Sequence, residues 1–481
     1  MAYTFKGGTH LNEHKNTRKC PVEKIDAPEY VYIPMSQHIG AHCTPTVAVG
    51  DRVDRGQVIG EIQAGLGCPV HASVSGVVKE IRSVNNAMGV AVQTVVIEND
   101  FENRLCPDIR PYEKPVTELT PEEVVEVVRK AGISGMGGAT FPTYAKISSA
   151  LGKAEKLIVN CAECEPYITA NHRLLLEQPE KVIGGVKILL KAFGLRRGII
   201  AIENNKMDAV REISALDFDP ELITICVMKT KYPQGDERQI IYALTGKELP
   251  AGKLPADVGC VIFNAETCAA IYNAFVYGMP LIERIVTVDG DCIGRPSNLL
   301  CPIGTPFSDL IRFCEGDPAR VKTLISGGPM MGFAQWDIDT PVIKGTSAVL
   351  AMSSAYEKKG HKEHSACIRC GKCVANCPMH LVPREIYKYA RKGDLESCEK
   401  FYATSCVECG TCTYNCPARL ELAQYIRTAK SKIIEKKRAA AAAAKKAAEE
   451  KAAAEKAAEE ARMKEENEGK EKPANEQSDK S

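Results

Sequence analysis

Two cysteine arrays near the carboxyl end constrain this chain more than any other feature of its sequence. In each array three cysteines are separated by two residues, and a fourth follows after three more residues and precedes a proline. The spacing is typical of iron–sulfur ligands, because three thiolates on one short loop meet three iron atoms of a cubane cluster. Paired Cys-x2-Cys units also bind zinc, but the third cysteine, the proline and the duplication favour two [4Fe–4S] clusters.

The fourth cysteine of each array lies too far along the chain to close the same cluster, and in two-cluster ferredoxins it serves the other one. The expected ligand sets are therefore Cys367, Cys370, Cys373 and Cys416 for one cluster, and Cys377, Cys406, Cys409 and Cys412 for the other. The segment between the arrays has a helical pattern, so residues 357–428 are predicted to form a largely α-helical two-cluster ferredoxin domain. Of the 21 cysteines, 13 lie outside the arrays, and most of these, Cys398 included, are expected to be small buried residues.

Charge and hydropathy exclude two broad classes of protein. Lys and Arg number 62 against 61 acidic residues, which argues against a nucleic-acid binder that relies on bulk electrostatics. No stretch reaches the roughly 18 apolar residues that a membrane span needs, and the N-terminus lacks the apolar segment of a secretory signal. The 481 residues therefore predict a soluble intracellular protein with about three or four domains.

Residues 28–104, which follow an N-terminal segment (1–27), read as short alternating β-segments broken by Gly, Asp and Asn. The half-similar strings at 47–62 and 70–81 resemble the two halves of a biotinyl- or lipoyl-type barrel-sandwich hybrid. Those carriers present a modifiable lysine between the halves, and residues 63–68 contain none. We therefore expect a structural or docking module without a carrier function.

The next predicted domain, residues 115–260, alternates helical and strand patterns. Thr120-Pro121-Glu122-Glu123 is a helix start with a capping box. Compact apolar runs at 156–160, 198–203 and 222–228 are separated by helical segments, which predicts an α/β layered domain. The glycine-rich loop 135–142 is not a Rossmann fingerprint, because that motif follows a strand and this loop follows a helix.

Two further regions differ from this pattern. Residues 261–350 mix strands, turns and one short helix, which predicts a small α+β unit of the β-grasp, SLBB-like kind, and a polar linker follows at 357–366. The tail, 429–481, is nearly all Ala, Glu, Lys and Arg. Such a composition forms helix readily but has little to bury, so we expect an exposed single helix that frays into a disordered end.

Four polar, turn-rich segments stand out within these domains. They are the glycine loop 135–142, the segments 160–166 and 232–238, and 263–267. The second lies at the carboxyl end of a predicted strand, where α/β sheets place their ligands. In this order the four resemble the flavin-bearing 51-kDa subunit of respiratory complex I. From the KGGTHLNEHK segment to the second cysteine array, about 1–430, the chain resembles the RnfC family, whose members are subunits of the Rnf ferredoxin:NAD oxidoreductases.

The resemblance implies noncovalent FMN, with NAD(H) as a substrate stacked upon it. It implies that Gly135, Gly137 and Gly138 let the backbone approach the flavin and that Lys146 reaches its phosphate. The remaining implied nucleotide-site residues are Asn160 and Glu163 against the flavin, Glu165 toward the nicotinamide nucleotide, Phe141 stacked on it, and Gly235, Asp236, Glu237, Asn264 and Thr267 on the far side. Two positions depart from the complex I pattern, which has Arg in place of Met136 and Ser in place of Cys164.

The implied function is that of an electron-entry subunit. Hydride would pass between NAD(H) and FMN, and single electrons would pass through two [4Fe–4S] clusters to partner subunits, an iron–sulfur subunit and integral membrane subunits among them, with ferredoxin as the indirect partner. The chain would then lie peripherally on the cytoplasmic face of a bacterial membrane. The alternatives are a soluble flavin/iron–sulfur reductase, such as a microcompartment cobalamin reductase, and a non-enzymatic scaffold.

Overall fold

The computed structural model describes residues 2–85, 90–219, 221–354 and 364–470. Most of the predicted linker 357–366 and the last eleven residues of the tail lie outside these ranges. The chain forms two units: residues 1–380 with 407–420, and residues 381–406 with 421–481.

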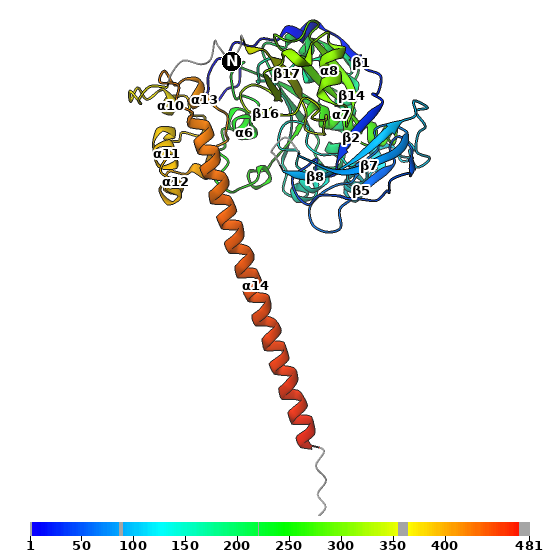
Figure 1. Cartoon of the computed structure of the whole chain (residues 1–481), viewed down its shortest axis with the longest axis vertical. Coiled ribbons are helices and arrows are strands. Elements are labelled where there is room, and N and C mark those ends of the chain that lie inside the picture. The colour runs from blue at the N-terminus through cyan, green and yellow to red at the C-terminus, as the bar shows by residue number, and fades with distance from the viewer. Residues whose placement is uncertain (1, 86–89, 220, 355–363, 471–481) are drawn as a thin grey trace, which may run out of the picture. The chain divides into compact units, whose positions relative to one another are not determined.

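The barrel-sandwich module belongs to the first unit and consists of two small sheets (Figure 1). A four-stranded antiparallel sheet has the order β2, β8, β7, β4, with bounds Tyr30–Pro34, Ala91–Asn99, Gly76–Asn85 and Arg52–Val53. A three-stranded sheet consists of β3 (Thr44–Pro45), β5 (Val58–Glu61) and β6 (Val70–His71). Alternate side chains of both sheets, such as Ile33, Ile59 and Val95, form one buried core. The predicted barrel-sandwich module is confirmed.

The α/β domain is built on a parallel sheet of order β11, β10, β9, β12. The strands are Ile223–Met228, Gly198–Glu203, Lys156–Cys161 and Cys260–Asn264, and the first three confirm the predicted runs. The helices are α1 (Pro121–Lys130), α2 (Thr143–Ala150), α3 (Ala170–Glu177), α4 (Pro179–Phe193), α5 (Met207–Ala215), α6 (Glu237–Thr245) and α7 (Ala265–Val276). The capping box of α1 is also confirmed, since Glu123 N donates to Thr120 Oγ1 at 3.3 Å and Thr120 N to Glu123 Oε2 at 2.9 Å.

The predicted boundary of this domain at residue 261 is wrong. Strand β12 pairs in register with β9 inside the parallel sheet, and α7 packs against α4. The α/β domain therefore continues through Val276. The cause is the strand order, because β12 is the last strand of this sheet in sequence but pairs with the first, β9. The long stretch of chain between the two strands conceals from sequence patterns that they share a sheet.

A six-stranded mixed sheet also belongs to the first unit and has the order β1, β14, β13, β17, β15, β16. Its strands are Val22–Lys24, Ser297–Pro302, Glu283–Asp289, Ala348–Met352, Thr323–Ser326 and Phe333–Gln335, and α8 (Phe307–Phe313) packs with them. The predicted N-terminal segment 1–27 is not separate, because β1 joins this sheet and Tyr3 forms a bridge with Met228 of the parallel sheet. The β-grasp assignment stays a prediction.

The second unit is helical and contains α11 (Pro383–Ala390), α12 (Leu395–Lys400), a short 3-10 helix (Ala403–Ser405) and α14 (Leu422–Lys470). Cys398 is fully buried, together with Ile386, Ile426 and Ile433. Tyr387 and Tyr425 pack edge to face with ring centroids 5.1 Å apart. Helix α14 is unbroken (Figure 1), and its side chains from 435 to 460 are all exposed.

Deletion of residues 436–481 is therefore expected to change the free energy of unfolding by no more than about 0.5 kcal/mol, because exposed Ala, Glu and Lys side chains contribute little packing. The last buried side chain of α14 in the described part is that of Ile433. Iron and flavin content, and the melting temperature, should match those of the full chain. Loss of iron or flavin from the truncated chain would contradict the prediction.

Candidate functional site

The carboxyl ends of two adjacent parallel strands define the site. Asn160 on β9 and Asn264 on β12 are register partners. Asn160 Nδ2 donates to Gly235 O at 2.9 Å, and its Oδ1 accepts from Ala162 N at 3.0 Å. Asn264 caps the N-terminus of α7 by accepting from Glu266 N at 2.9 Å. Three of the four predicted segments thus meet at the sheet edge where α/β folds bind ligands.

The glycine loop, the fourth segment, lies against Asn264. It closes through a hydrogen bond from Gly135 N to Phe141 O at 2.8 Å. A Cβ on Gly137 would lie 3.1 Å from Asn264 Cβ, so a larger residue would crowd that side chain. Gly138 has φ +147°, and a Cβ built there would meet no atom within 4 Å. Open space therefore borders the loop at Gly138, as a nucleotide-binding loop requires.

Two predicted residues make direct contacts that tie these segments together. Met136 N donates to Thr267 Oγ1 at 3.0 Å. Lys146 Nζ donates to Ile262 O at 3.0 Å and lies 3.5 Å from Glu237 Oε2. The Lys146 ammonium is therefore already shared between a carbonyl and a carboxylate.

Asp236 belongs to the segment 232–238, and Phe141 belongs to the glycine loop. Asp236 caps α6 by accepting from Arg238 N at 3.2 Å and Gln239 N at 3.3 Å. Burial raises the pKa of its carboxyl to about 6. Phe141 is half-buried at the end of the glycine loop. Their contacts with a nucleotide stay predictions.

Buried polar groups without partners at this site agree with the binding of a nucleotide. Ser134 Oγ and Thr143 Oγ1, at the two ends of the glycine loop, are buried and have no hydrogen-bond partner among the described residues. The same holds for both amide atoms of Gln234, which is fully buried beside Gly235. Such orphaned groups are rare in folded proteins. They supply donors and acceptors that a bound flavin nucleotide can use.

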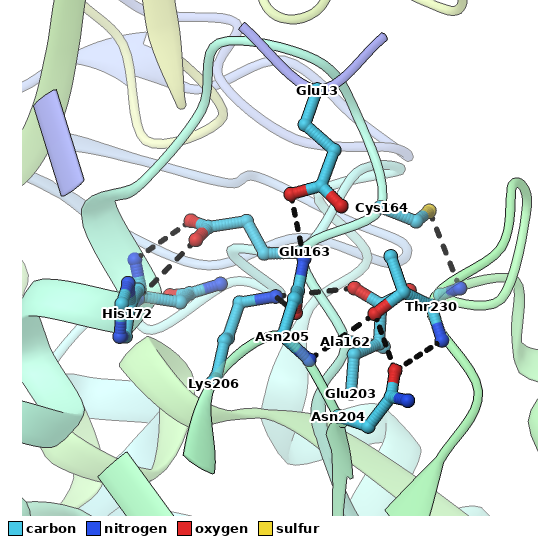
Figure 2. A network of polar contacts seen from close by, with 12 residues as sticks. Glu13, Ala162, Glu163, Cys164, His172, Glu203, Asn204, Asn205, Lys206 and Thr230 are labelled. Atoms are coloured by element: carbon cyan, nitrogen blue, oxygen red, sulfur yellow. Dashed lines mark hydrogen bonds and ion pairs between the residues drawn. The ribbon is translucent and has the colours of Figure 1, made fainter. Parts of the chain in front are cut away.

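The carboxylate of Glu163 is engaged by the protein itself. It accepts from Asn171 N at 2.9 Å and from His172 N at 3.3 Å, at the N-terminus of α3 (Figure 2). A carboxylate there is stabilised by the exposed N–H groups of the first turn. In the same loop, Cys164 Sγ accepts from Gly235 N at 3.3 Å. Contact of Glu163 with the flavin stays a prediction.

Glu165 is held by a different element. Its carboxylate accepts from Met330 N and Met331 N, both at 3.0 Å, and from the Tyr232 hydroxyl at 3.2 Å. A Cβ on Gly328 would lie only 2.2 Å from Glu165 Oε2, so glycine is needed for this approach. Burial raises the pKa of Glu165 to about 6. The role of Glu165 toward the nicotinamide nucleotide stays a prediction.

Sequence reasoning did not single out Tyr232 or Gln234. The single proton of the Tyr232 hydroxyl is shared between Glu165 Oε1 and the nearer Cys409 O, which lies 2.8 Å away, so one buried side chain joins the nucleotide segment to the second cysteine array. The only sequence signal was their position in the polar segment 232–238. The chemical role of each depends on a contact that no local pattern reveals.

The two cysteine arrays have the same backbone conformation. Short helices α10 (Lys372–Ala375) and α13 (Thr411–Tyr414) follow glycines with φ +76° and +77°, and Arg369 and Glu408 have φ +56° and +58°. This repetition in three dimensions fits two equivalent cluster loops, and the thiol donor set fits iron. Ten of the 13 cysteines outside the arrays are buried, which confirms the expectation for most of them.

The environment of Cys409 relates the two arrays. Burial raises the pKa of its thiol, and the nearby Cys377 thiol raises the pKa further. This proximity agrees with a fourth cysteine that serves the other array. Among the described residues no three His, Cys, Asp or Glu side chains converge to hold a metal. The ligand sets therefore stay predictions.

Comparison with known proteins matches each of these regions. The model of the Nuo51 FMN-binding domain matches residues 128–273, that of the RnfC barrel sandwich hybrid domain 3–102, and that of the 4Fe-4S dicluster domain 363–420. The C subunit of the Na(+)-translocating ferredoxin:NAD(+) oxidoreductase complex of Acetobacterium woodii is 43% identical over 90% of this chain and 98% of its own length. The chain belongs to the RnfC family.

A second RnfC relative, the C subunit of the proton-translocating ferredoxin:NAD(+) oxidoreductase complex of Clostridium ljungdahlii, is 42% identical over 90% of this chain and 94% of its own length. Similarity to solved structures is weaker. A chain of an NAD+-reducing [NiFe]-hydrogenase in the air-oxidized state matches with a TM-score of 0.47 at 18% identity, over 61% of this chain and 55% of that one. In the part of the chain that the structure describes, no helix is both long and apolar enough to cross a membrane.

Proposed function

We propose that this RnfC chain is the peripheral electron-entry subunit of an ion-translocating ferredoxin:NAD oxidoreductase complex. The observation that carries the proposal is the hydrogen bond from Tyr232 to Cys409 O, within one folded unit. This hydrogen bond supports the proposal that the nucleotide site and one cluster loop are neighbours. The names of the relatives supply the class of reaction, and the FMN-binding and 4Fe-4S domains supply the classes of cofactor.

When bound, FMN would supply hydride exchange with NAD(H) and transfer of single electrons, and [4Fe–4S] clusters would carry those electrons. The protein supplies position and charge. The glycine loop leaves backbone room at Gly138, and the Lys146 ammonium supplies positive charge for a phosphate. Gln234, Ser134 and Thr143 offer the hydrogen-bonding atoms that the protein does not use itself.

The clusters are proposed to take their ligands across the two arrays. The proposed sets are Cys367, Cys370, Cys373 and Cys416, and Cys377, Cys406, Cys409 and Cys412. Electrons would pass from them to other subunits of the complex, an iron–sulfur subunit and membrane subunits among them, and ferredoxin would be the indirect partner. The chain would then lie on the cytoplasmic face of the membrane, held there by its partners.

The proposal is tested on anaerobically purified full-length protein by its absorption spectrum and flavin content before and after addition of NADH. We expect bound FMN and bleaching of both flavin and iron–sulfur absorption by NADH. A protein that holds clusters but no flavin, or one that NADH does not reduce, would refute the proposal. Co-purification with membrane subunits separates it from a free-standing reductase.

Replacing Glu165 with glutamine is expected to lower kcat/KM for NADH by about tenfold to 100-fold while bound FMN is retained. Because the carboxylate is proposed to face the nicotinamide nucleotide, the amide removes a charged hydrogen-bonding partner of the nucleotide, and a hydrogen bond to a charged group is worth about 1.5–3 kcal/mol. The amide also keeps only one acceptor oxygen for the Met330 and Met331 N–H groups. Steady-state kinetics with a dye acceptor measures the effect. Glu248→Gln, at an exposed position, is the matched control. Wild-type kinetics in the Glu165→Gln variant would show that this carboxylate has no part in NADH oxidation.

A further inference from the structure

The proposed chemistry assigns no role to the KGGTHLNEHK segment, yet this segment runs along the nucleotide site. Residues 7–18 are called the N-terminal strap. Gly8 N donates to Asn376 O at 2.9 Å, and Thr9 exchanges both backbone hydrogen bonds with Tyr232, at 2.8 and 2.9 Å. Gly8 has φ +73°, and a Cβ there would lie 2.5 Å from Tyr232 O. The strap therefore begins in close contact with the turn that carries Gly235.

Lys15 is the strap residue that reaches the loop between β9 and α3. Its Nζ donates to Glu163 O at 2.8 Å, Glu165 O at 2.8 Å and Ile168 O at 2.5 Å. A lysine ammonium has three N–H donors, and each has one carbonyl partner here. The three carbonyls belong to the loop that presents both predicted carboxylates.

Neighbouring strap residues hold the same loop. Tyr167 N donates to Glu13 O at 2.9 Å, and the His14 ring stacks on the Tyr167 ring with centroids 4.9 Å apart. The hydroxyls of Thr17 and Thr169 lie 2.5 Å apart. The strap thus contacts the loop at several points along its length, and the Lys15 ammonium makes three of these contacts.

The strap also reaches the polar cluster behind this loop. Asn205 Nδ2 donates to Glu13 Oε2 at 3.0 Å, and the adjacent Lys206 Nζ lies 3.1 Å from Glu203 Oε2 (Figure 2). Burial lowers the pKa of Lys15 to about 8, partly opposed by Glu163. A lysine that served only packing would not bring its ammonium into such a costly environment.

We propose that Lys15 is a positioning residue of the nucleotide site: its ammonium fixes the backbone of residues 163–168, and through it the loop's approach to FMN and NAD(H). The inference rests on the proposed function for the identity of the nucleotide. The inference adds the N-terminal strap, which precedes the α/β domain in sequence, to the residues that shape the nucleotide site. Because the ammonium contacts backbone carbonyls, its effect on the position of the loop does not depend on which side chains the loop carries.

The test compares Lys15→Met with Lys19→Met, which changes an exposed lysine of the following turn. Both variants are made in the full chain and purified anaerobically. Loop order is measured by hydrogen exchange of peptides that cover residues 162–169, and FMN affinity by titration of flavin-depleted protein. For Lys15→Met we expect exchange in this loop to accelerate, and the FMN dissociation constant to rise, by at least about tenfold, since hydrogen bonds to a charged group are lost. Lys19→Met should match the wild type in both.

A second readout uses pH. Deprotonation of Lys15 removes one of three donors, so wild-type FMN affinity should fall between pH 7 and pH 9, and this step should be absent in Lys15→Met. The other titratable groups that face the ammonium are Glu163, Glu165, Glu203, Lys206 and Cys164, and the pKa of Glu165, about 6, lies below this pH range. They are unchanged in the variant, so a difference between the two pH profiles reports on Lys15.

The outcomes separate this inference from the proposed function. Faster loop exchange in Lys15→Met with normal iron content supports the positioning role even in a protein that binds no FMN, which would refute the proposed function alone. Unchanged loop exchange and unchanged FMN affinity would overturn the inference. If Lys15→Met does not fold, Lys15→Arg keeps the charge but cannot match the three carbonyls. It should then show the same local acceleration, and its absence would also overturn the inference.

Discussion

Replacing Gly185 with alanine is expected to destabilise the α/β domain severely, with loss of bound flavin. Gly185 lies in α4 where this helix crosses α7, and a Cβ there would lie 1.9 Å from Cys268 O and 2.5 Å from Cys268 C. The obstructing atoms are backbone, so no side-chain rotation relieves the clash. Overpacking of a core typically costs about 1–3 kcal/mol and occasionally more, and we expect the upper end here. Thermal and urea unfolding of the purified chain measure the loss.

Gly194→Ala is the matched control, because it lies at the carboxyl end of the same helix. Gly194 has φ +65°, and no atom lies within 4 Å of a Cβ built there. Only backbone strain is then added, about 1–2 kcal/mol. We expect the wild type to be the most stable, Gly194→Ala to be less stable, and Gly185→Ala to be the least stable. Equal stability of the two variants would show that the α4–α7 crossing relaxes to admit a methyl group.

Local patterns in the sequence predicted much of the α/β domain. The apolar runs at 156–160 and 198–203 became β9 and β10 because short buried runs bounded by turns have few other structures available. The start of α1 was found because its capping box lies within four consecutive residues, 120–123. The repeated cysteine spacing likewise predicted two loops, and their backbones do repeat.

Features that depend on distant residues were not predicted. Strand β12 was assigned to the wrong domain because its partner β9 lies about a hundred residues earlier. The carboxylates of Glu163 and Glu165 carry backbone partners that no motif indicates. No local pattern indicates the role of Lys15, since its three partners lie some 150 residues away. In each case the deciding interaction joins segments that the sequence keeps far apart.

The second large effect concerns the clusters: the purified wild-type chain is expected to hold about eight iron atoms, because two complete sets of four thiolates are present. Cys370→Ser should reduce this to about four and leave the flavin, and Cys370→Ala, which lacks any ligand atom, should do the same. Cys398→Ser is the matched control, because Cys398 lies between the arrays and donates to Ile386 O at 3.6 Å, a bond that serine can also make. A colourless protein with stoichiometric zinc would refute the cluster assignment.

The crossed ligand sets give this experiment a sharper form. Cys377 belongs to the first array by sequence, but its thiol lies near that of Cys409 in the second array and raises the pKa of Cys409. If the fourth cysteine serves the other array, Cys377→Ser and Cys409→Ser should remove the same electron paramagnetic resonance signal, and Cys370→Ser should remove the other. If each array closes its own cluster, Cys377→Ser should instead match Cys370→Ser. Every variant lacks only one thiol, so the signal that remains shows which cysteines share a cluster. This comparison does not use the stability of the variants.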